Sequence, residues 1–283
     1  PGVVFETGAG VLDEVDERFG AAGFDGAVVL QLFDVEHARR RALDRLPVGL
    51  SAIQRHEAEL GLEQALVTAL MDANHWVMAA VASRPLLTGF VGIDPVLLPP
   101  DRLDHHLRTM AALGARGVKL HPVTQGYRPD DPRMARLYDL CCELDLVVLS
   151  HSGPGHRGGG SARPSEFAAV LERWPRLRLV LAHLGGAAWR EAADLAASFP
   201  GVLFDVSEIV AWAGAPRAPS TAQLAEAVRR IGADRIMLGS DFPWYDPAAT
   251  ADKVDALPGL GTAERAALLG GTATAQLGLA VGR

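Results

Sequence analysis

Four short apolar runs in this chain carry polar residues at their ends, and these residue types can bind a metal ion or move a proton. The runs GVKLHP, LVVLSHSG, LRLVLAHLGG and RIMLGSDFPW carry, in that order, Lys119 with His121, then His151, His183 and Asp241. A strand that is apolar along its length and polar only at its tip is not explained by packing. Because four runs share this feature, we interpret the residues as one chemical site.

Imidazole and carboxylate groups are the ordinary protein ligands of Zn²⁺ and similar divalent ions, and a catalytic site keeps one position open for water. Such an ion lowers the pKa of bound water to about 7 and polarises a carbonyl group, while a nearby side chain moves protons. We therefore predict His151, His183 and Asp241 as metal ligands. Asp241 suits the general base, and His183 binds the metal or stabilises a developing oxyanion.

Two further residues are predicted to contact the substrate. His121 ends its run next to Pro122, and Lys119 lies two residues before it. Lys119 has three interpretations: it binds a substrate carboxylate, it bridges two metal ions after carbamylation, or it pairs with an acid inside the fold.

The elements that position these residues follow from an alternation of short β-branched runs with longer amphipathic stretches, which is typical of a buried parallel sheet. Strands are predicted at Gly26–Leu32, Leu87–Ile93, Ala115–Leu120, Leu146–Ser150, Leu177–Ala182, Val202–Asp205 and Arg235–Gly239. Helices are predicted at Leu12–Ala22, Ile53–Ala82, Arg102–Leu113, Pro132–Glu143, Pro164–Arg173, Trp189–Ala197, Thr221–Ile231 and Thr262–Leu277.

This pattern predicts an α/β fold, a TIM-type (β/α)8 barrel formed by one domain over residues 1–283. Catalytic groups of such barrels collect at the carboxyl ends of the strands, where the polar tips lie. Closing the barrel needs an eighth strand. That strand is either the short Val3-Val4-Phe5 run or a segment upstream of Pro1.

Composition excludes several classes of function. The net charge of −7 argues against a nucleic-acid or anionic-membrane partner, since either would need a basic face. Cys141 and Cys142 are adjacent and cannot easily bridge, so we expect reduced thiols and a cytoplasmic location. We also expect no secretory leader and no apolar run long enough to span a bilayer.

The runs quoted above resemble the amidohydrolase superfamily, specifically its amidohydrolase-related (amidohydrolase 2) branch. The resemblance covers most of the chain, including RIMLGSDFPWYDP and the closing LLGGTATAQLGL. It implies a (β/α)8 barrel with one or two divalent metals. His151 matches the fifth-strand ligand, His183 the sixth-strand histidine, and Asp241 the eighth-strand aspartate that is ligand and base together. Lys119 lies where some relatives carry a carbamylated lysine.

The start of the chain departs from this pattern. Members of the branch open with a strand that ends D-x-H-x-H, whereas this chain opens PGVVFETGAG. Two explanations remain open. The first strand lies before Pro1, or VVFETG is a degraded first strand that leaves Glu6 as a poor substitute ligand. Under the second explanation metal affinity falls, and a metal-free or inert barrel becomes an alternative.

The function predicted first is that of a metal-dependent hydrolase acting on a C–O or C–N bond of a small carboxylated substrate such as a lactone, ester or amide. Metal-activated water is the nucleophile and Asp241 the general base. The alternative is a non-oxidative decarboxylase of the same branch. The predicted cofactor is a divalent metal, Zn²⁺ first, with Mn²⁺ or Fe²⁺ as alternatives. The resemblance also implies a homodimer, and the only other expected partner is a small-molecule substrate.

Overall fold

Seven parallel strands form one sheet and follow one another in chain order. The computed structural model describes residues 42–278 except positions 86, 156–159, 217 and 243, together with residue 39 and the backbone of residues 27–30. The strands are β1 Ala27–Leu30, β2 Leu87–Gly92, β3 Gly117–Leu120, β4 Val147–Ser150, β5 Leu179–Leu181, β6 Leu203–Asp205 and β7 Ile236–Met237.

Each of the seven predicted strands is confirmed. Each pairs in parallel with the next, as in the register of Val118 with Val148, and the connections run through helices, so all carboxyl ends point to the same side of the sheet. Among the described residues, β1 and β7 are the two ends of the sheet. The proposed strand at Val3-Val4-Phe5 and the helix at Leu12–Ala22 lie outside the described residues.

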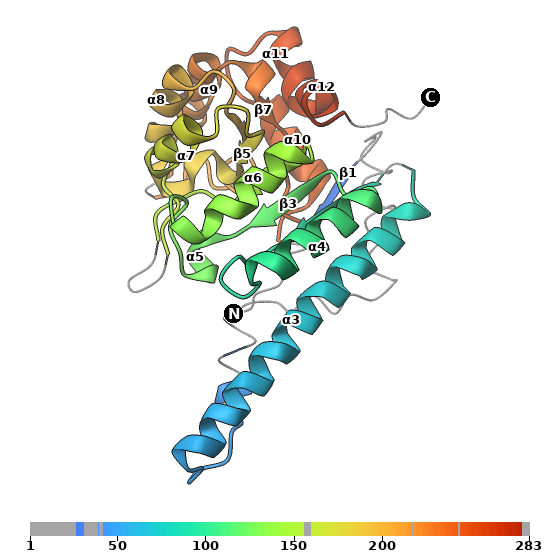
Figure 1. The fold of residues 1–283 in the computed structure, drawn as a ribbon. Helices are drawn as coiled ribbons and strands as arrows, with labels where there is room; N and C mark the ends of the chain where they lie inside the picture. The colour runs from blue at the N-terminus through green and yellow to red at the C-terminus, as the bar shows by residue number, and fades with distance from the viewer. Residues whose placement is uncertain are drawn as a thin grey trace.

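The helices cover the outer face of the sheet (Figure 1). They are α3 Ala52–Ala82, α4 Pro100–Ala112, α5 Pro122–Gln125, α6 Ala135–Glu143, α7 Ala168–Arg173, α8 Arg190–Ser198, α9 Thr221–Ile231, α10 Pro247–Asp255, α11 Thr262–Ala266 and α12 Thr272–Leu277. Shorter helical turns are η1 Pro132–Met134, η2 Pro164–Phe167, η3 Ala182–Ala188, η4 Ala233–Arg235 and η5 Ala267–Gly271.

Local capping signals explain why several predicted helix boundaries agree with the structure. The α9 helix begins after Ser220, whose hydroxyl accepts a hydrogen bond from the Gln223 backbone N–H while the Gln223 side chain accepts from Ser220 N. This reciprocal pair satisfies two backbone donors that no helical carbonyl can reach. Leu224, Val228 and Ile231 then recur at helical spacing and are buried.

One helical prediction needs correction, and two helices, α5 and α10, were not predicted. The helix predicted over Thr262–Leu277 is broken by the π-type turn η5, where Gly270 leaves helical backbone geometry (φ 167°, ψ −28°). The α10 helix was not predicted, although its start carries a recognisable signal. Asp246 accepts a hydrogen bond from Ala249 N, and Pro247 occupies the first helical turn.

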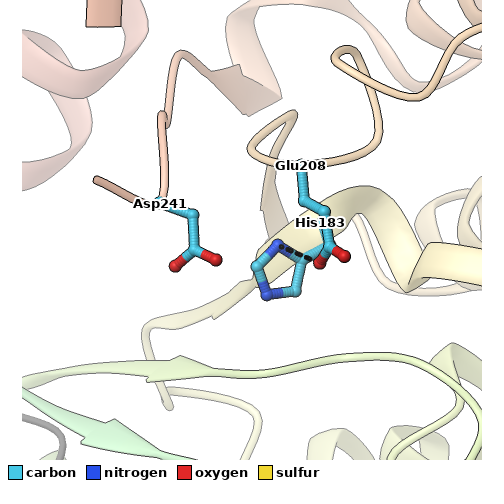
Figure 2. A group of neighbouring side chains, drawn as sticks. All are labelled: His183, Glu208 and Asp241. Carbon is cyan, nitrogen blue, oxygen red and sulfur yellow. Dashed lines mark ion pairs between the residues drawn. The ribbon is translucent and has the colours of Figure 1, made fainter. Parts of the chain in front are cut away.

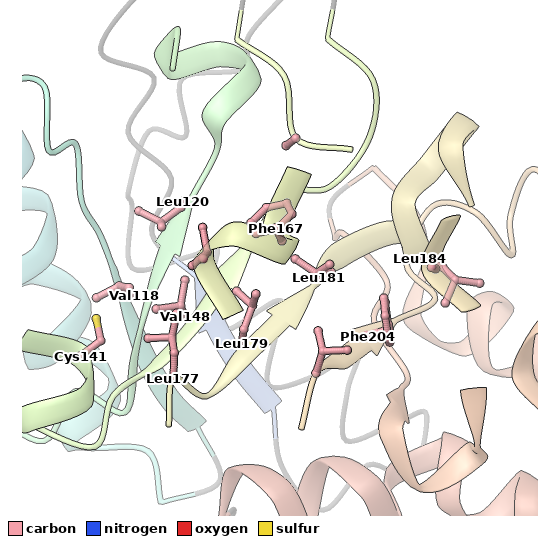
Figure 3. Packing of buried hydrophobic residues seen from close by; sticks show 14 of the residues in the cluster. Val118, Leu120, Cys141, Val148, Phe167, Leu177, Leu179, Leu181, Leu184 and Phe204 are labelled. Atoms are coloured by element: carbon pink, nitrogen blue, oxygen red, sulfur yellow. The ribbon is translucent and has the colours of Figure 1, made fainter. Parts of the chain in front are cut away.

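The sheet is apolar on both faces because successive side chains of a strand point to opposite sides. On β4, Val148 belongs to the large core between sheet and helices. Its neighbours Val147 and Leu149 belong to a second cluster on the inner face. Figure 3 shows Val148 and Leu181 in the large core, with Phe167 from η2 packed over them. Burial on both faces explains why these strands read as continuous apolar runs.

The α3 helix projects well beyond the rest of the fold (Figure 1). Within the described residues it is one helix that is long and apolar enough to cross a membrane, by length and composition only. This corrects the expectation that no run is long enough. A single helix that meets these two criteria is weak evidence for a membrane, and 33% of its most apolar window is buried. Its buried residues, among them Leu70 and Val77, begin at Leu66, close to the middle of the helix, and continue towards its C-terminal end.

A polar network joins α3 to the sheet and to α4. Asn74 is fully buried, donates through Nδ2 to Gly92 O (2.8 Å) and accepts from Gly92 N (2.9 Å). Its Nδ2 also lies 2.9 Å from His106 Nε2, so that nitrogen must accept and carries no hydrogen. Burial, together with the charges of His75 and His105, lowers the pKa of His106 to about 4.

Candidate metal centre

Three side chains from successive strand ends converge at the carboxyl side of the sheet. His183 lies in η3 directly after β5, Glu208 in the loop after β6, and Asp241 in the loop after β7. One ligand atom of each lies within 4.8 Å of the others. Figure 2 shows the Asp241 carboxylate and the His183 ring facing each other, with Glu208 beside the ring. We call these three residues the donor cluster.

The backbone at the donor cluster is unusual. Among the described residues other than glycine, positive φ occurs at Asp145, His183 (62°), Leu184, Glu208 (60°) and Asp241 (56°). A side chain in this left-handed region costs about 1–3 kcal/mol and persists only where the surroundings enforce it. All three members of the donor cluster have this conformation. Three independent loops therefore turn sharply so that their side chains reach one point.

Hydrogen bonds accepted by Asp205 hold two of these loops together. Asp205 ends β6, and its Oδ1 accepts from the backbone N–H of His183 (3.0 Å) and of Ser207 (2.9 Å). It also accepts from the Ser207 hydroxyl. The Ser207 hydroxyl oxygen in turn lies 2.9 Å from His183 Nδ1. The loop that carries Glu208 is thus tied to the turn that carries His183.

The loops that carry Glu208 and Asp241 are joined further out. The indole N–H of Trp212, four residues after Glu208, donates to the hydroxyl of Tyr245, four residues after Asp241. Lys253 on α10 adds a hydrogen bond to Ala211 O (3.0 Å). These contacts fix the two carboxylate-bearing loops relative to each other.

The other predicted histidines lie beside the donor cluster. The His151 ring lies 4.9 Å from the His183 ring, centroid to centroid. The His121 ring stacks on His151 at 4.0 Å with an interplanar angle of 10°. His121 is also the N-cap of α5, where its Nδ1 accepts from Thr124 N (3.3 Å). His151 is not part of the donor cluster, so its role as a metal ligand and that of His121 in substrate binding stay predictions.

Lys119 lies buried on β3 at 6% exposure. Burial lowers the pKa of its ammonium group, and the negative charges of Asp205 and Asp241 act in the opposite direction. Lys119 is therefore within electrostatic reach of the carboxylates around the donor cluster. The structure brings it to the same end of the sheet as the residues with which it was grouped from sequence.

Glu208 is the site residue that the sequence analysis missed. The signal that could have found it is the one used for the other runs, because the strand VLFD also has a polar tip at Asp205, followed closely by Ser207 and Glu208.

The donor cluster fits a divalent metal ion. One imidazole and two carboxylates are ordinary ligands for such ions. Ligands at about 2.1 Å from one ion lie at most about 4.2 Å apart, so small side-chain movements from the present separations bring all three into contact with one ion. Lys119 lies within electrostatic reach of the Asp241 carboxylate.

Comparison with solved structures shows the fold. The chain is similar to a TIM-barrel protein from Bordetella bronchiseptica (TM-score 0.62, 20% identity, 87% of this chain and 91% of that chain). It is also similar to 2,6-dihydroxybenzoate decarboxylase from Rhizobium (TM-score 0.63, 16% identity, 94% and 88%). A third similar structure is 5-carboxyvanillate decarboxylase from Novosphingobium aromaticivorans with bound manganese (TM-score 0.68, 15% identity, 94% and 80%).

The sequence comparisons agree with this fold. The model of the amidohydrolase family, amidohydrolase 2 type, matches residues 32–279. No curated protein matches the sequence. The predicted α/β TIM-type barrel is confirmed, and so is the resemblance given in the sequence analysis.

Proposed function

This chain belongs to the amidohydrolase family, and on that premise we propose that it is a metal-dependent decarboxylase of a small aromatic acid. The observation that carries the proposal is the convergence of His183, Glu208 and Asp241 within 4.8 Å. The likeness to two decarboxylases of hydroxylated aromatic acids favours decarboxylation, which the sequence analysis placed second to hydrolysis.

The donor set bears on the choice of metal. Two of the three donors are carboxylates. Carboxylate ligands suit Mn²⁺, whereas sites rich in thiolate and imidazole ligands suit Zn²⁺. The similar 5-carboxyvanillate decarboxylase binds manganese. We therefore place Mn²⁺ before Zn²⁺, which reverses the order given from sequence. When bound, the ion supplies positive charge that attracts and orients the oxygen atoms of an acidic substrate.

Side chains of the protein carry out the proton transfer and contact the substrate. Decarboxylation breaks the bond between the ring carbon and the carboxylate, releases CO₂ and leaves an electron pair on carbon that must accept one proton. Asp241 is the group we assign to hold that proton on a carboxyl oxygen and deliver it to the carbon. We assign His121, whose ring stacks on His151 beside the cluster, to contact the substrate.

The experiment supplies the purified protein with Mn²⁺ and then with 5-carboxyvanillate or 2,6-dihydroxybenzoate in D₂O. We expect release of CO₂ and one deuterium on the vacated ring carbon. Asp241→Asn should abolish turnover and keep the circular dichroism spectrum. Asp252→Asn, on the exposed side of α10, is the matched control and should remain active.

A parallel panel of lactones, esters and amides tests the hydrolase prediction. Turnover of a member of this panel without CO₂ release from any acid would overturn the decarboxylase proposal in favour of hydrolysis. A protein that takes up no metal and turns over nothing would support the metal-free or inert alternative.

A further inference from the structure

The hydrogen-bond partners of His183 determine which of its ring nitrogens carries the hydrogen. Nδ1 lies 2.9 Å from Ser207 Oγ and 3.3 Å from the Ser207 backbone oxygen. It also lies 3.7 Å from Glu208 Oε2. The His183 side chain is 6% exposed, so water does not compete freely for these positions.

The single hydrogen of the Ser207 hydroxyl is already used. Asp205 Oδ1 accepts from two backbone N–H groups and, as a carboxylate oxygen, has no hydrogen to give, so the contact between Ser207 Oγ and Asp205 requires the hydroxyl to donate. Ser207 Oγ can then only accept from His183. The Ser207 backbone oxygen is also an acceptor, so all groups that face Nδ1 are acceptors.

We propose that Ser207 is a positioning residue that holds neutral His183 with its hydrogen on Nδ1. The Nε2 lone pair is then the one available to a metal ion or to a proton of the substrate. Asp205 acts through Ser207, because it orients the hydroxyl and fixes the backbone of both residues. The inference rests on the proposed function only in assigning His183 to the site, since the hydrogen position belongs to the protein without metal or substrate.

Without the Ser207 hydroxyl, the hydrogen of His183 should no longer be held on Nδ1. In Ser207→Ala the backbone oxygen remains at its longer distance, and the imidazole is free to adopt the Nε2–H form that neutral histidine prefers in water. An outer partner of a metal ligand changes metal affinity by about 10–100-fold. Ser207→Thr keeps a hydroxyl at the same position and should restore wild-type behaviour.

Nuclear magnetic resonance of ¹⁵N-histidine-labelled, metal-free protein at pH 8 tests the proposal. The His183 signals are identified by their loss in His183→Gln. We expect a protonated-type Nδ1 and an unprotonated-type Nε2 in the wild type and in Ser207→Thr, and an increased Nε2–H population in Ser207→Ala. Calorimetric titration should show Mn²⁺ binding weakened about 10–100-fold in Ser207→Ala alone.

Thr272→Val is the matched control, because Thr272 on α12 is also a buried residue with a hydroxyl group. Its Oγ1 donates to the backbone oxygen of Ala233 in η4 (2.8 Å), away from the donor cluster. It should leave the His183 signals and the Mn²⁺ affinity unchanged. A wild-type His183 with its hydrogen on Nε2 would overturn the inference, even if Ser207→Ala does not fold. That result leaves decarboxylation untouched, and absence of decarboxylation leaves the measured hydrogen position untouched, so the two failures are distinguishable.

Discussion

The Glu208→Gln substitution separates the metal ligands that the structure brings together from those expected from sequence. It removes one of the two carboxylates of the donor cluster, so the charge of the three donors changes from about −2 to −1 while the side-chain shape is kept. Removing an outer partner of a metal ligand already weakens binding about 10–100-fold. Loss of a direct carboxylate ligand should exceed that range, so we expect Mn²⁺ to bind more than about 100-fold more weakly, or about 2.8 kcal/mol.

The assay is calorimetric titration of metal-free protein with Mn²⁺, together with metal content per chain by inductively coupled plasma mass spectrometry. Glu226→Gln is the matched control, because Glu226 lies exposed on α9 and pairs only with Arg229 among the charged groups of the described residues. It should bind as the wild type does. His151→Gln is measured beside it.

The refuting result is Mn²⁺ binding of wild-type strength in Glu208→Gln. If His151→Gln loses the metal under the same conditions, the ligands are His151, His183 and Asp241, as the sequence analysis predicted. The left-handed backbone at Glu208 would then have another cause.

Three further predictions concern the pH dependence of stability, the sheet and the loops. His106 should stay neutral in the folded protein down to pH about 4 but take up a proton in the unfolded chain below pH 6.5, so its contribution is fully present above pH 6.5 and is lost as pH falls towards 4. In urea unfolding, the free energy of unfolding of the wild type should fall by about 2 kcal/mol more than that of His106→Gln between pH 7 and 5. An equal fall in both proteins would refute the lowered pKa of His106. Gly117→Ala would place Cβ 2.4 Å from Val147 O, so we expect a loss of about 1–3 kcal/mol or more in thermal unfolding; Gly201→Ala, with nothing within 4 Å, should change stability little. Tyr245→Phe removes the acceptor for the Trp212 indole and should weaken Mn²⁺ binding about 2–10-fold, for a hydrogen bond of about 0.5–1.5 kcal/mol; an additive further loss on adding Trp212→Phe would contradict this shared contact.

The secondary structure was largely predictable because its causes are local. Continuous apolar runs locate the strands, since a strand covered on both faces needs apolar side chains throughout. The α9 helix has the predicted bounds Thr221–Ile231 because Ser220 caps its start and Gly232 follows its end. The break at η5 within the last helix accompanies contacts between η5 and the end of β7, where Leu238 N donates to Leu268 O, and helical periodicity carries no sign of these contacts.

Local sequence also predicted which residue types would meet at the carboxyl edge of the sheet. His183 and Asp241 follow apolar runs, and parallel strands bring their carboxyl ends to one side. The alternation alone therefore places polar tips around a common face. It does not determine how far each side chain reaches across that face.

The tertiary structure determines how far each side chain reaches across that face. Glu208 joins His183 and Asp241 because the backbone turns into the left-handed region at all three positions. For a residue with a Cβ this conformation is unfavourable in an isolated chain, so it forms only where distant contacts enforce it. At His183 one such contact is the Asp205 carboxylate, 22 residues further along the chain. Sequence determines the strands and the polar residues at their tips, and the packed fold decides which of those residues share one site.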